Sequence, residues 1–158
     1  MARARDIDGL DAATSFVEAA RRIVAVRAQE VFEHAEGVLD TREIERVHDM
    51  RVATRRLRAV LEIFGPAFPK GEVGPVLHDV KALADALGAR RDPDVAIAGL
   101  ERFAAEAPRA DGPGAESLIA ALRAEQHAGN EILAAALERA RDGDLQERLE
   151  DLVGGARG

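Results

Sequence analysis

Apolar residues recur along this chain at alternating spacings of three and four, which is the pattern of amphipathic α-helices. The first such stretch runs from Asp11 to about Leu39, and its apolar members are Phe16, Ala20, Ile23, Val24, Ala28, Val31, Ala35 and Val38. The β-branched residues never form the period-two runs that are typical of half-buried strands. The pattern therefore predicts an all-α protein.

The second predicted helix begins at Asp40-Thr41-Arg42-Glu43. This segment has the form of a capping box, with Asp40 as the N-cap and Glu43 reaching back to it. The helix ends near Phe64, because Gly65-Pro66 interrupts the pattern. Its apolar positions form the predicted buried seam: Val47, Met50, Thr54, Leu57, Leu61 and Phe64. A connector rich in Pro and Gly follows over residues 65–75.

The rest of the chain is predicted to hold four further helices. Residues 76–87 form one, with Gly88 as its left-handed stop, and Asp92-Pro93 begins the next, which reaches about Ala107. After a loop at residues 108–114, a long helix spans about 115–141 and a short one follows Gly143. We expect one antiparallel bundle of about four long helices plus short ones. It forms a single domain over residues 1–158, with a core at about 11–153 and a flexible tail at 154–158.

Composition narrows the classes of function. The 158 residues carry 22 Lys and Arg against 29 Asp and Glu, a net charge of -7, so the average surface repels nucleic acid. Without cysteine there is no disulfide framework and no thiolate zinc site, and five Phe are the only aromatic residues that could stack on bases. No apolar run has the length of a membrane span or a signal peptide. We therefore expect a cytoplasmic protein without membrane contact, for which nucleic acid is a poor partner.

One segment departs from this acidic average. Between Arg46 and Arg58 there are five arginines and a single acid, Asp49. On a helical wheel His48, Arg51, Arg55 and Arg58 fall within about 80° of one another, directly beside the buried seam, and span about 15 Å along the axis. We call these four residues the basic stripe. Their charges repel one another unless anions lie among them, and arginine forks suit phosphate oxygens.

Acids from other helices could also neutralise the basic stripe. Glu62, the one acid on the same face of this helix, can pair with Arg58. Arg56 lies on the far side, where it can pair with Asp49 or Glu45. Other cationic residues fall at the edges of the neighbouring predicted helices, and a bundle that turns these edges together would form a basic groove. They are Arg27 and His34 on the first helix, Lys81 on the third, and Arg90 and Arg91 after Gly88.

The segment VHDMRVATRRLRAVLEIF, residues 47–64, resembles the signature of the CHAD family, the conserved-histidine α-helical domain. Residues 77–100, LHDVKALADALGARRDPDVAIAGL, are similar to the next helix and turn of that family. The resemblance implies an all-helical fold that binds inorganic polyphosphate on a basic surface, without catalysis, and in some members recruitment to polyphosphate granules. Carried over by position, the binding residues are His48, Arg51, Arg55, Arg56, Arg58, Lys81, Arg90 and Arg91. No cofactor or metal is implied.

Members of that family typically have two related helical halves that face each other across a basic channel. Here the His and Arg block occurs once, and residues 101–158 contain no second copy. We therefore expect a homodimer, in which a twofold axis supplies the missing half.

Two other functions stay open. His48-Asp49-Met50-Arg51 is similar to the phosphoacceptor motif of sensor histidine kinases, although no Pro stands two residues after Arg51 and no nucleotide-binding domain is present. The second open function is that of a helical module that binds a protein partner. Phosphate-ester hydrolysis has the least support, because it usually needs clustered carboxylates to hold a metal. His34, His48 and His78 provide no pair of metal ligands four residues apart.

Overall fold

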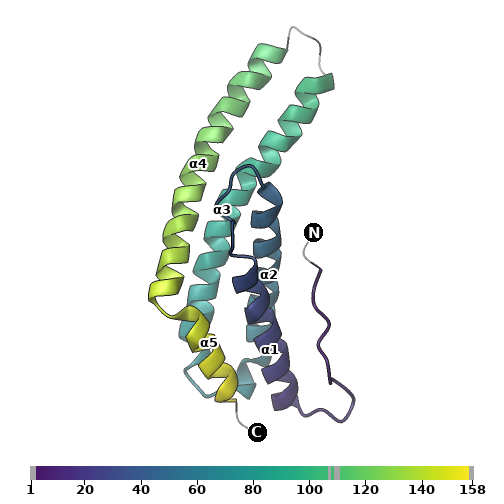
Figure 1. Ribbon diagram of the computed structural model, residues 1–158, viewed down its shortest axis with the longest axis vertical. Coiled ribbons are helices and arrows are strands. Elements are labelled where there is room, and N and C mark those ends of the chain that lie inside the picture. Colours follow the sequence, from purple (N-terminus) through teal and green to yellow (C-terminus); the bar gives the residue numbers. More distant parts are fainter. Residues whose placement is uncertain (1–2, 107, 109–110, 157–158) are drawn as a thin grey trace.

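The computed structural model describes residues 3–106, 108 and 111–156, and every regular element among them is a helix (Figure 1). In chain order these are α1 (Phe16–Glu33), α2 (Ile44–Phe64), the 3₁₀ turn η1 (Gly65–Ala67), α3 (Val73–Glu106), α4 (Gly112–Asp142) and α5 (Leu145–Gly154). The predicted all-α bundle with four long helices is confirmed. No helix in the described part is both long and apolar enough to cross a bilayer.

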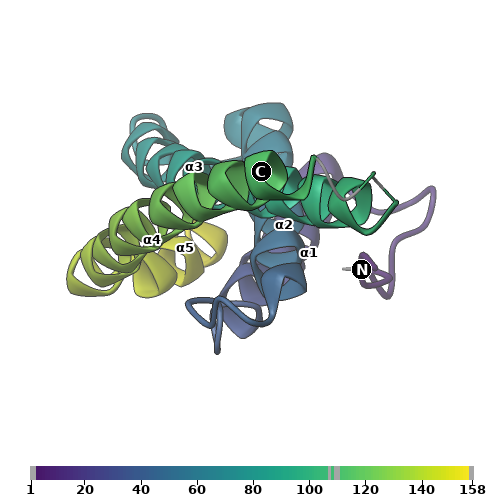
Figure 2. The same cartoon turned by 90° about the horizontal axis from the view of Figure 1, so that it is seen from above.

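The helices pack in a chain of neighbours around one apolar core. Helix α2 lies between α1 and α3, α4 runs along α3, and α5 folds back onto α1. Leu57, Leu61, Leu87, Leu133 and Leu149 are almost completely buried where these helices meet. Each such side chain contributes roughly 1.5–3 kcal/mol by leaving water. Seen from above, in Figure 2, the N-terminal segment lies on the side of α1 away from α4 and α5.

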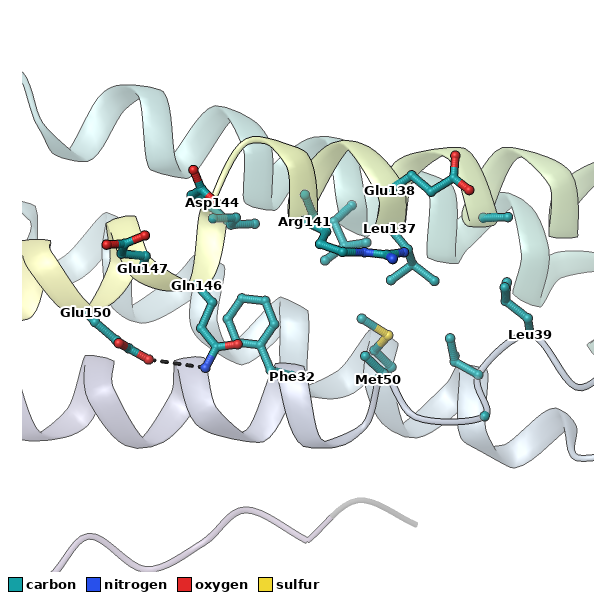
Figure 3. Close-up of a pocket in the computed structure, with 17 residues that line it drawn as sticks. Phe32, Leu39, Met50, Leu137, Glu138, Arg141, Asp144, Gln146, Glu147 and Glu150 are labelled. Carbon is teal, nitrogen blue, oxygen red and sulfur yellow. Dashed lines mark hydrogen bonds between the residues drawn. The ribbon is translucent and has the colours of Figure 1, made fainter.

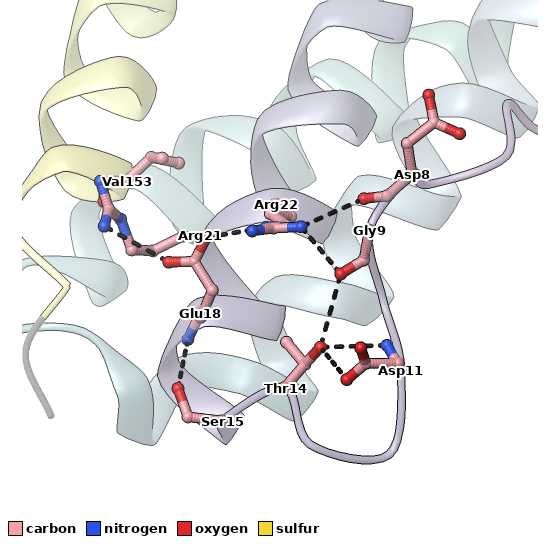
Figure 4. A network of polar contacts seen from close by, with 9 residues as sticks. All are labelled: Asp8, Gly9, Asp11, Thr14, Ser15, Glu18, Arg21, Arg22 and Val153. Atoms are coloured by element: carbon pink, nitrogen blue, oxygen red, sulfur yellow. Dashed lines mark hydrogen bonds and ion pairs between the residues drawn. The ribbon is translucent and has the colours of Figure 1, made fainter.

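Helix α1 is shorter than the predicted range 11–39 at both ends. The side chain of Ser15 is the N-cap and accepts a hydrogen bond from the backbone N–H of Glu18, while Asp11 and Thr14 bond to each other in the preceding turn (Figure 4). After Glu33 the chain turns, and Gly37 has a left-handed backbone with φ of 68°. Val38 is nevertheless buried. The helical spacing of apolar residues continues beyond the end of α1 because the residues of the turn also pack on the core. The predicted helix is too long for this reason.

The predicted capping box at residues 40–43 is wrong. Helix α2 begins at Ile44, and its N-cap, Glu43, makes no capping hydrogen bond. The carboxylate of Asp40 instead accepts hydrogen bonds from the backbone N–H of Arg42, at 2.9 Å, and from the guanidinium of the same residue. Glu43 pairs with Arg46. Asp40 thus closes a turn before the helix, because its short side chain reaches the backbone two residues on.

The predicted break at residues 88–92 is also wrong, because α3 continues through both Gly88 and Pro93. Gly88 does not take the left-handed backbone of a helix stop. Pro93 has no N–H to donate, which leaves the carbonyl of Ala89, four residues earlier, without its helical partner. Gly129 of α4 packs against this carbonyl so closely that a Cβ there would lie 2.9 Å from the oxygen. Because Gly129 has no side chain, α4 can pack directly over the Ala89 carbonyl that lacks its helical hydrogen bond.

Beside the contact between Ala89 and Gly129, a buried polar network also joins α3 to α4. Arg90 and Asp94, one turn apart on α3, form an ion pair with no exposed side-chain surface. Asp94 also accepts a hydrogen bond of 2.6 Å from Gln126, and Arg90 donates one of 3.1 Å to Asn130. Asn130 in turn bonds to the carbonyl of Leu39 before α2. Proline at position 93 is tolerated because these contacts hold the helix on both sides.

The remaining boundaries agree with expectation apart from a few residues. Helix α4 extends the predicted 115–141 by a few residues at its start, and α5 follows Gly143 as predicted. Of the predicted tail, Gly154 ends α5 and Ala156 packs against the core. Residues 157–158 of that tail lie outside the described part, as do 107, 109 and 110 around the predicted loop.

Candidate functional site

The basic stripe lies on α2 beside a seam that the structure confirms as buried. Five of the six predicted seam residues are buried, and Phe64 packs at the edge of the core. Because the seam faces inward, the neighbouring stripe comes to the margin of the bundle. His48 and Arg51 are half-buried there, whereas Arg55 and Arg58 are exposed.

Two arginines of the stripe keep their full donor capacity. Within the described part of the chain, neither Arg51 nor Arg55 makes a hydrogen bond or an ion pair. They lie one helical turn apart on the same face, about 6 Å along the axis. Their guanidinium groups therefore present two uncompensated positive charges to anything that lies along α2.

Glu62 neutralises the next part of the stripe. Its carboxylate accepts a hydrogen bond of 3.1 Å from Arg58, one turn earlier on α2, and lies 3.3 Å from the ammonium of Lys81 on α3. These contacts, Arg58 first and Lys81 second, lower the pKa of the Glu62 carboxyl. One carboxylate thus serves two cations, and this end of the surface keeps a net positive charge. All three side chains are substantially exposed, so the pairs contribute little to stability.

Arg91 joins α2 and α3 at the other end of their contact, near the start of α2. Its guanidinium donates to the carbonyl of Ile44, at 3.3 Å, and lies 3.6 Å from the carboxylate of Glu45. The side chain is mostly buried. Arg91 therefore joins the middle of α3 to the first turn of α2, and it borders the stripe as a partly neutralised cation.

Arg27 and Arg56 face α1 and the N-terminal segment instead. Arg27 donates to both carboxylate oxygens of Glu30 at 2.8 Å, and the backbone of Arg5 donates to the same group. Burial opposes ionisation of Glu30, but these hydrogen bonds and the attraction of Arg27 and Arg56 lower its pKa overall. Arg56 is therefore off the stripe, as the helical wheel indicates, and its charge partly serves Glu30.

Two predicted positions do not belong to an accessible surface. Arg90 is completely buried in its ion pair with Asp94, so a polyanion on the surface cannot reach its guanidinium. Arg27 is nearly so, with 12% of its side chain exposed and both donors of one nitrogen engaged by Glu30. His34 lies at the end of α1, where its backbone N–H caps the helix.

His48 lies at one end of the stripe beside two carboxylates. The possible ligand atoms of Glu45, His48 and Asp49 lie within 4.8 Å of one another, the one such group among the described residues. Oxygen and imidazole donors of this kind could hold a divalent cation. Residues 45, 48 and 49 share one helix face at i, i+3 and i+4, so the group is visible in the sequence, although the histidines alone provide no pair of ligands.

The link between α2 and α3 through Glu62 and Lys81 is only partly visible in the sequence. The pairing of Arg58 with Glu62 follows from their i, i+4 spacing and is confirmed. That Lys81 reaches the same carboxylate depends on the packing of the two helices, and no local pattern indicates it. Taken together, the surface offers several cationic donors along one line, an arrangement that suits a ligand with repeated anionic groups.

Comparison with known protein families gave one match. The family model described as the CHAD domain matches residues 22–158, which include α2 to α5 and most of α1. All residues of the basic stripe lie inside this range. Comparisons with curated proteins and with solved structures gave no match.

Proposed function

Because the chain belongs to the CHAD domain family, we propose that its basic stripe binds inorganic polyphosphate and does not alter it chemically. The observation that carries this proposal is the pair Arg51 and Arg55, which lie one turn apart without an acidic partner in the described structure. Unpaired guanidinium groups held this close repel each other, and a bound chain of phosphates removes that repulsion. Each fork can engage phosphate oxygens at two points.

The binding surface extends from this pair in both directions along α2. His48 precedes it, and Arg58 with Lys81 follows it, sharing Glu62. Arg91 borders the surface beside the exposed Glu45, and Arg56, off the stripe and near Glu30, adds to its positive potential from a distance. Arg27 and Arg90 stabilise the fold and do not contact the ligand in this proposal. Several weak phosphate contacts on one ligand act together through their effective concentration.

The proposed complex forms in the cytoplasm or on polyphosphate granules, and a second copy of the chain completes the site. A twofold axis that places two basic stripes across from each other would enclose the ligand. Affinity would then depend steeply on salt, because a linear polyanion releases condensed counterions when it is bound.

Charge reversal tests the stripe directly. The double variant Arg51→Glu with Arg55→Glu should lose binding to long-chain polyphosphate, because two attractions become two repulsions. Arg102→Glu with Arg139→Glu makes the same change of net charge at exposed positions of α3 and α4 and should bind nearly as the unaltered chain does. Isothermal titration measures the affinities, and circular dichroism confirms that both variants stay helical. Unchanged binding by the first variant would place the site elsewhere.

Phosphotransfer through His48 is the second candidate, since its imidazole lies beside the carboxylates of Glu45 and Asp49. His48→Ala separates the two functions. It should only weaken polyphosphate binding, by one donor among several, whereas phosphotransfer needs the imidazole itself. Stable labelling of the unaltered chain by a radioactive phosphodonor, lost in His48→Ala, would support the second candidate.

A further inference from the structure

A second surface lies on the other side of α2 from the basic stripe. A cavity of about 860 Å³ opens between the end of α1, the turn that follows it, and the corner where α4 meets α5 (Figure 3). Met50, on its floor, is about 160° around α2 from His48. The cavity exists because α4 packs on α3 and α5, and no extensive contact brings it against α1.

The floor of this cavity is apolar and reaches the core. Phe32, Met50 and Leu137 project into it from α1, α2 and α4 (Figure 3), and Val38 and Leu83 complete the floor. A second cavity of about 520 Å³ continues along α1 past Ala25 and shares Phe32, Gln146 and Glu150 with the first. Together the two exceed the range of about 300–1,000 Å³ that is usual for small-molecule sites. Their shape is a groove along one helix, which suits an extended segment.

Acidic residues stand along the rim of the groove on α4, α5 and the turn between them. They are Glu138, Asp144, Glu147 and Glu150, and Arg141 is the one cation in the lining. Within the described structure none of these four acids has an ion pair, so their negative charges are not compensated by a neighbouring side chain. The rim therefore attracts positive charge, and the floor accepts apolar side chains.

From this combination we infer that the groove is the docking site for a basic amphipathic helix of a partner protein. Such a helix places apolar side chains at i, i+3, i+4 and i+7 on the floor, and its Lys and Arg residues meet the acidic rim. The occupant is not α2 of a second copy, because the apolar seam of α2 is buried in its own bundle. The inference does not depend on polyphosphate binding, since the two surfaces lie on different sides of α2.

Methionine labelling gives a direct test, because Met50 is one of only two methionines in the chain. The probe is a synthetic 16-residue Leu/Lys amphipathic helix, roughly four turns long, added to the full chain carrying 13C-methyl methionine. We expect the Met50 methyl signal to shift as the peptide binds. A Leu/Glu peptide with the same apolar pattern should not bind. Polyphosphate should leave the Met50 signal in place, so failure here and failure of the proposed function are distinguishable.

Matched charge variants separate the rim from the general acidity of the chain. Glu138→Lys with Glu147→Lys should weaken binding of the Leu/Lys peptide about tenfold, since four units of charge change at the rim. Glu116→Lys with Glu125→Lys makes the same change at exposed positions of α4 away from the groove and should have a much smaller effect. Equal weakening by both pairs, an unmoved Met50 signal, or equal binding of the Leu/Glu peptide would each overturn the inference. A Met50 shift with octylammonium but not with the peptide would overturn it in favour of a small-molecule site.

Discussion

At the scale of single residues, the positive surface charge of this protein depends on which arginines have an acidic partner. Most arginines of α1 and α3 pair within one or two turns of the same helix or with an adjacent segment, as Arg22 does with Glu18 and Arg90 with Asp94. On α2 the acids are concentrated at the two ends, at Glu45, Asp49 and Glu62, and Arg51 and Arg55 lie between them. Spacing along α2 therefore leaves Arg51 and Arg55 without an acid on their own helix, and in the described structure no acid from a neighbouring helix pairs with them.

Removing the carboxylate of Glu62 should strengthen polyphosphate binding. In Glu62→Gln the charges of Arg58 and Lys81 are no longer compensated, and one repulsive negative charge is lost from the surface. We expect affinity to rise by roughly two- to fivefold at low salt, the size of one exposed ion pair. Glu116→Gln, far along α4, is the control. Titration calorimetry at two salt concentrations measures the change, and weaker binding by Glu62→Gln would contradict the position of the site.

Asp40 provides a pH test of the turn before α2. Hydrogen bonds from the side chain and then the backbone of Arg42 lower the pKa of Asp40 from 3.8 to about 2. A lowered pKa in the folded state means that the charged carboxylate stabilises the fold above about pH 4, and that this contribution is lost as the pH falls toward 2. The unaltered chain should therefore be more stable than Asp40→Asn at pH 7, and the difference should shrink below about pH 4 and disappear only below about pH 2. Thermal unfolding at a series of pH values would show it, and a constant difference would exclude this role.

At the scale of elements, the two longest helices, α3 and α4, contact each other where Pro93 interrupts the hydrogen bonds of α3. Pro93 has no N–H to donate to the carbonyl of Ala89, and Gly129 of α4 lies directly against that carbonyl. The buried network of Arg90, Asp94 and Gln126 lies beside this contact. The defect in α3 is tolerated because the neighbouring helix has no side chain at the point of approach.

Two glycine-to-alanine variants should therefore have opposite effects. In Gly129→Ala the new Cβ would lie 2.9 Å from a backbone oxygen, so α3 and α4 must move apart, at a cost of about 1–3 kcal/mol. In Gly88→Ala the Cβ meets nothing within 4 Å, and alanine favours the helix by about 0.5–1 kcal/mol. Urea unfolding of both variants measures the two changes. Stabilisation by Gly129→Ala would show that the helices are not in contact there.

At the scale of the whole molecule, a positively charged surface and an acidic groove lie on different sides of the bundle. The chain carries a net charge of -7, yet the basic stripe lies on one side of α2, and the acids Glu138, Asp144, Glu147 and Glu150 lie around the groove at α4 and α5. The parts of α3 and α4 beyond α1 and α2 form a two-helix arm (Figure 1). Val95, Phe103 and Leu118 are each more than half exposed in this region. An arm of two helices has no further layer to cover its apolar residues.

Self-association is the expected consequence at this scale. We expect the chain to be a dimer at micromolar concentration, because a second copy can cover exposed apolar surface and place a second basic stripe beside the first. Light scattering should give twice the mass of the chain without polyphosphate present. Measurement with added polyphosphate is the control, since a long polyanion can bridge monomers. A strictly monomeric chain in the absence of the ligand would contradict the dimer.

The sequence by itself determined the helical class, the seam of α2 and the stripe beside it, because a helix turns by a fixed angle per residue. It also indicated the pairing of Arg58 with Glu62, which lie on one helix. It could not place Arg90 in the interior or continue α3 through Pro93, since both depend on Gln126 and Gly129 of another helix. The sharing of Glu62 by Lys81 and the groove beneath Phe32 likewise arise where separate helices meet. Local spacing fixes which residues share a face, and only packing decides what that face meets.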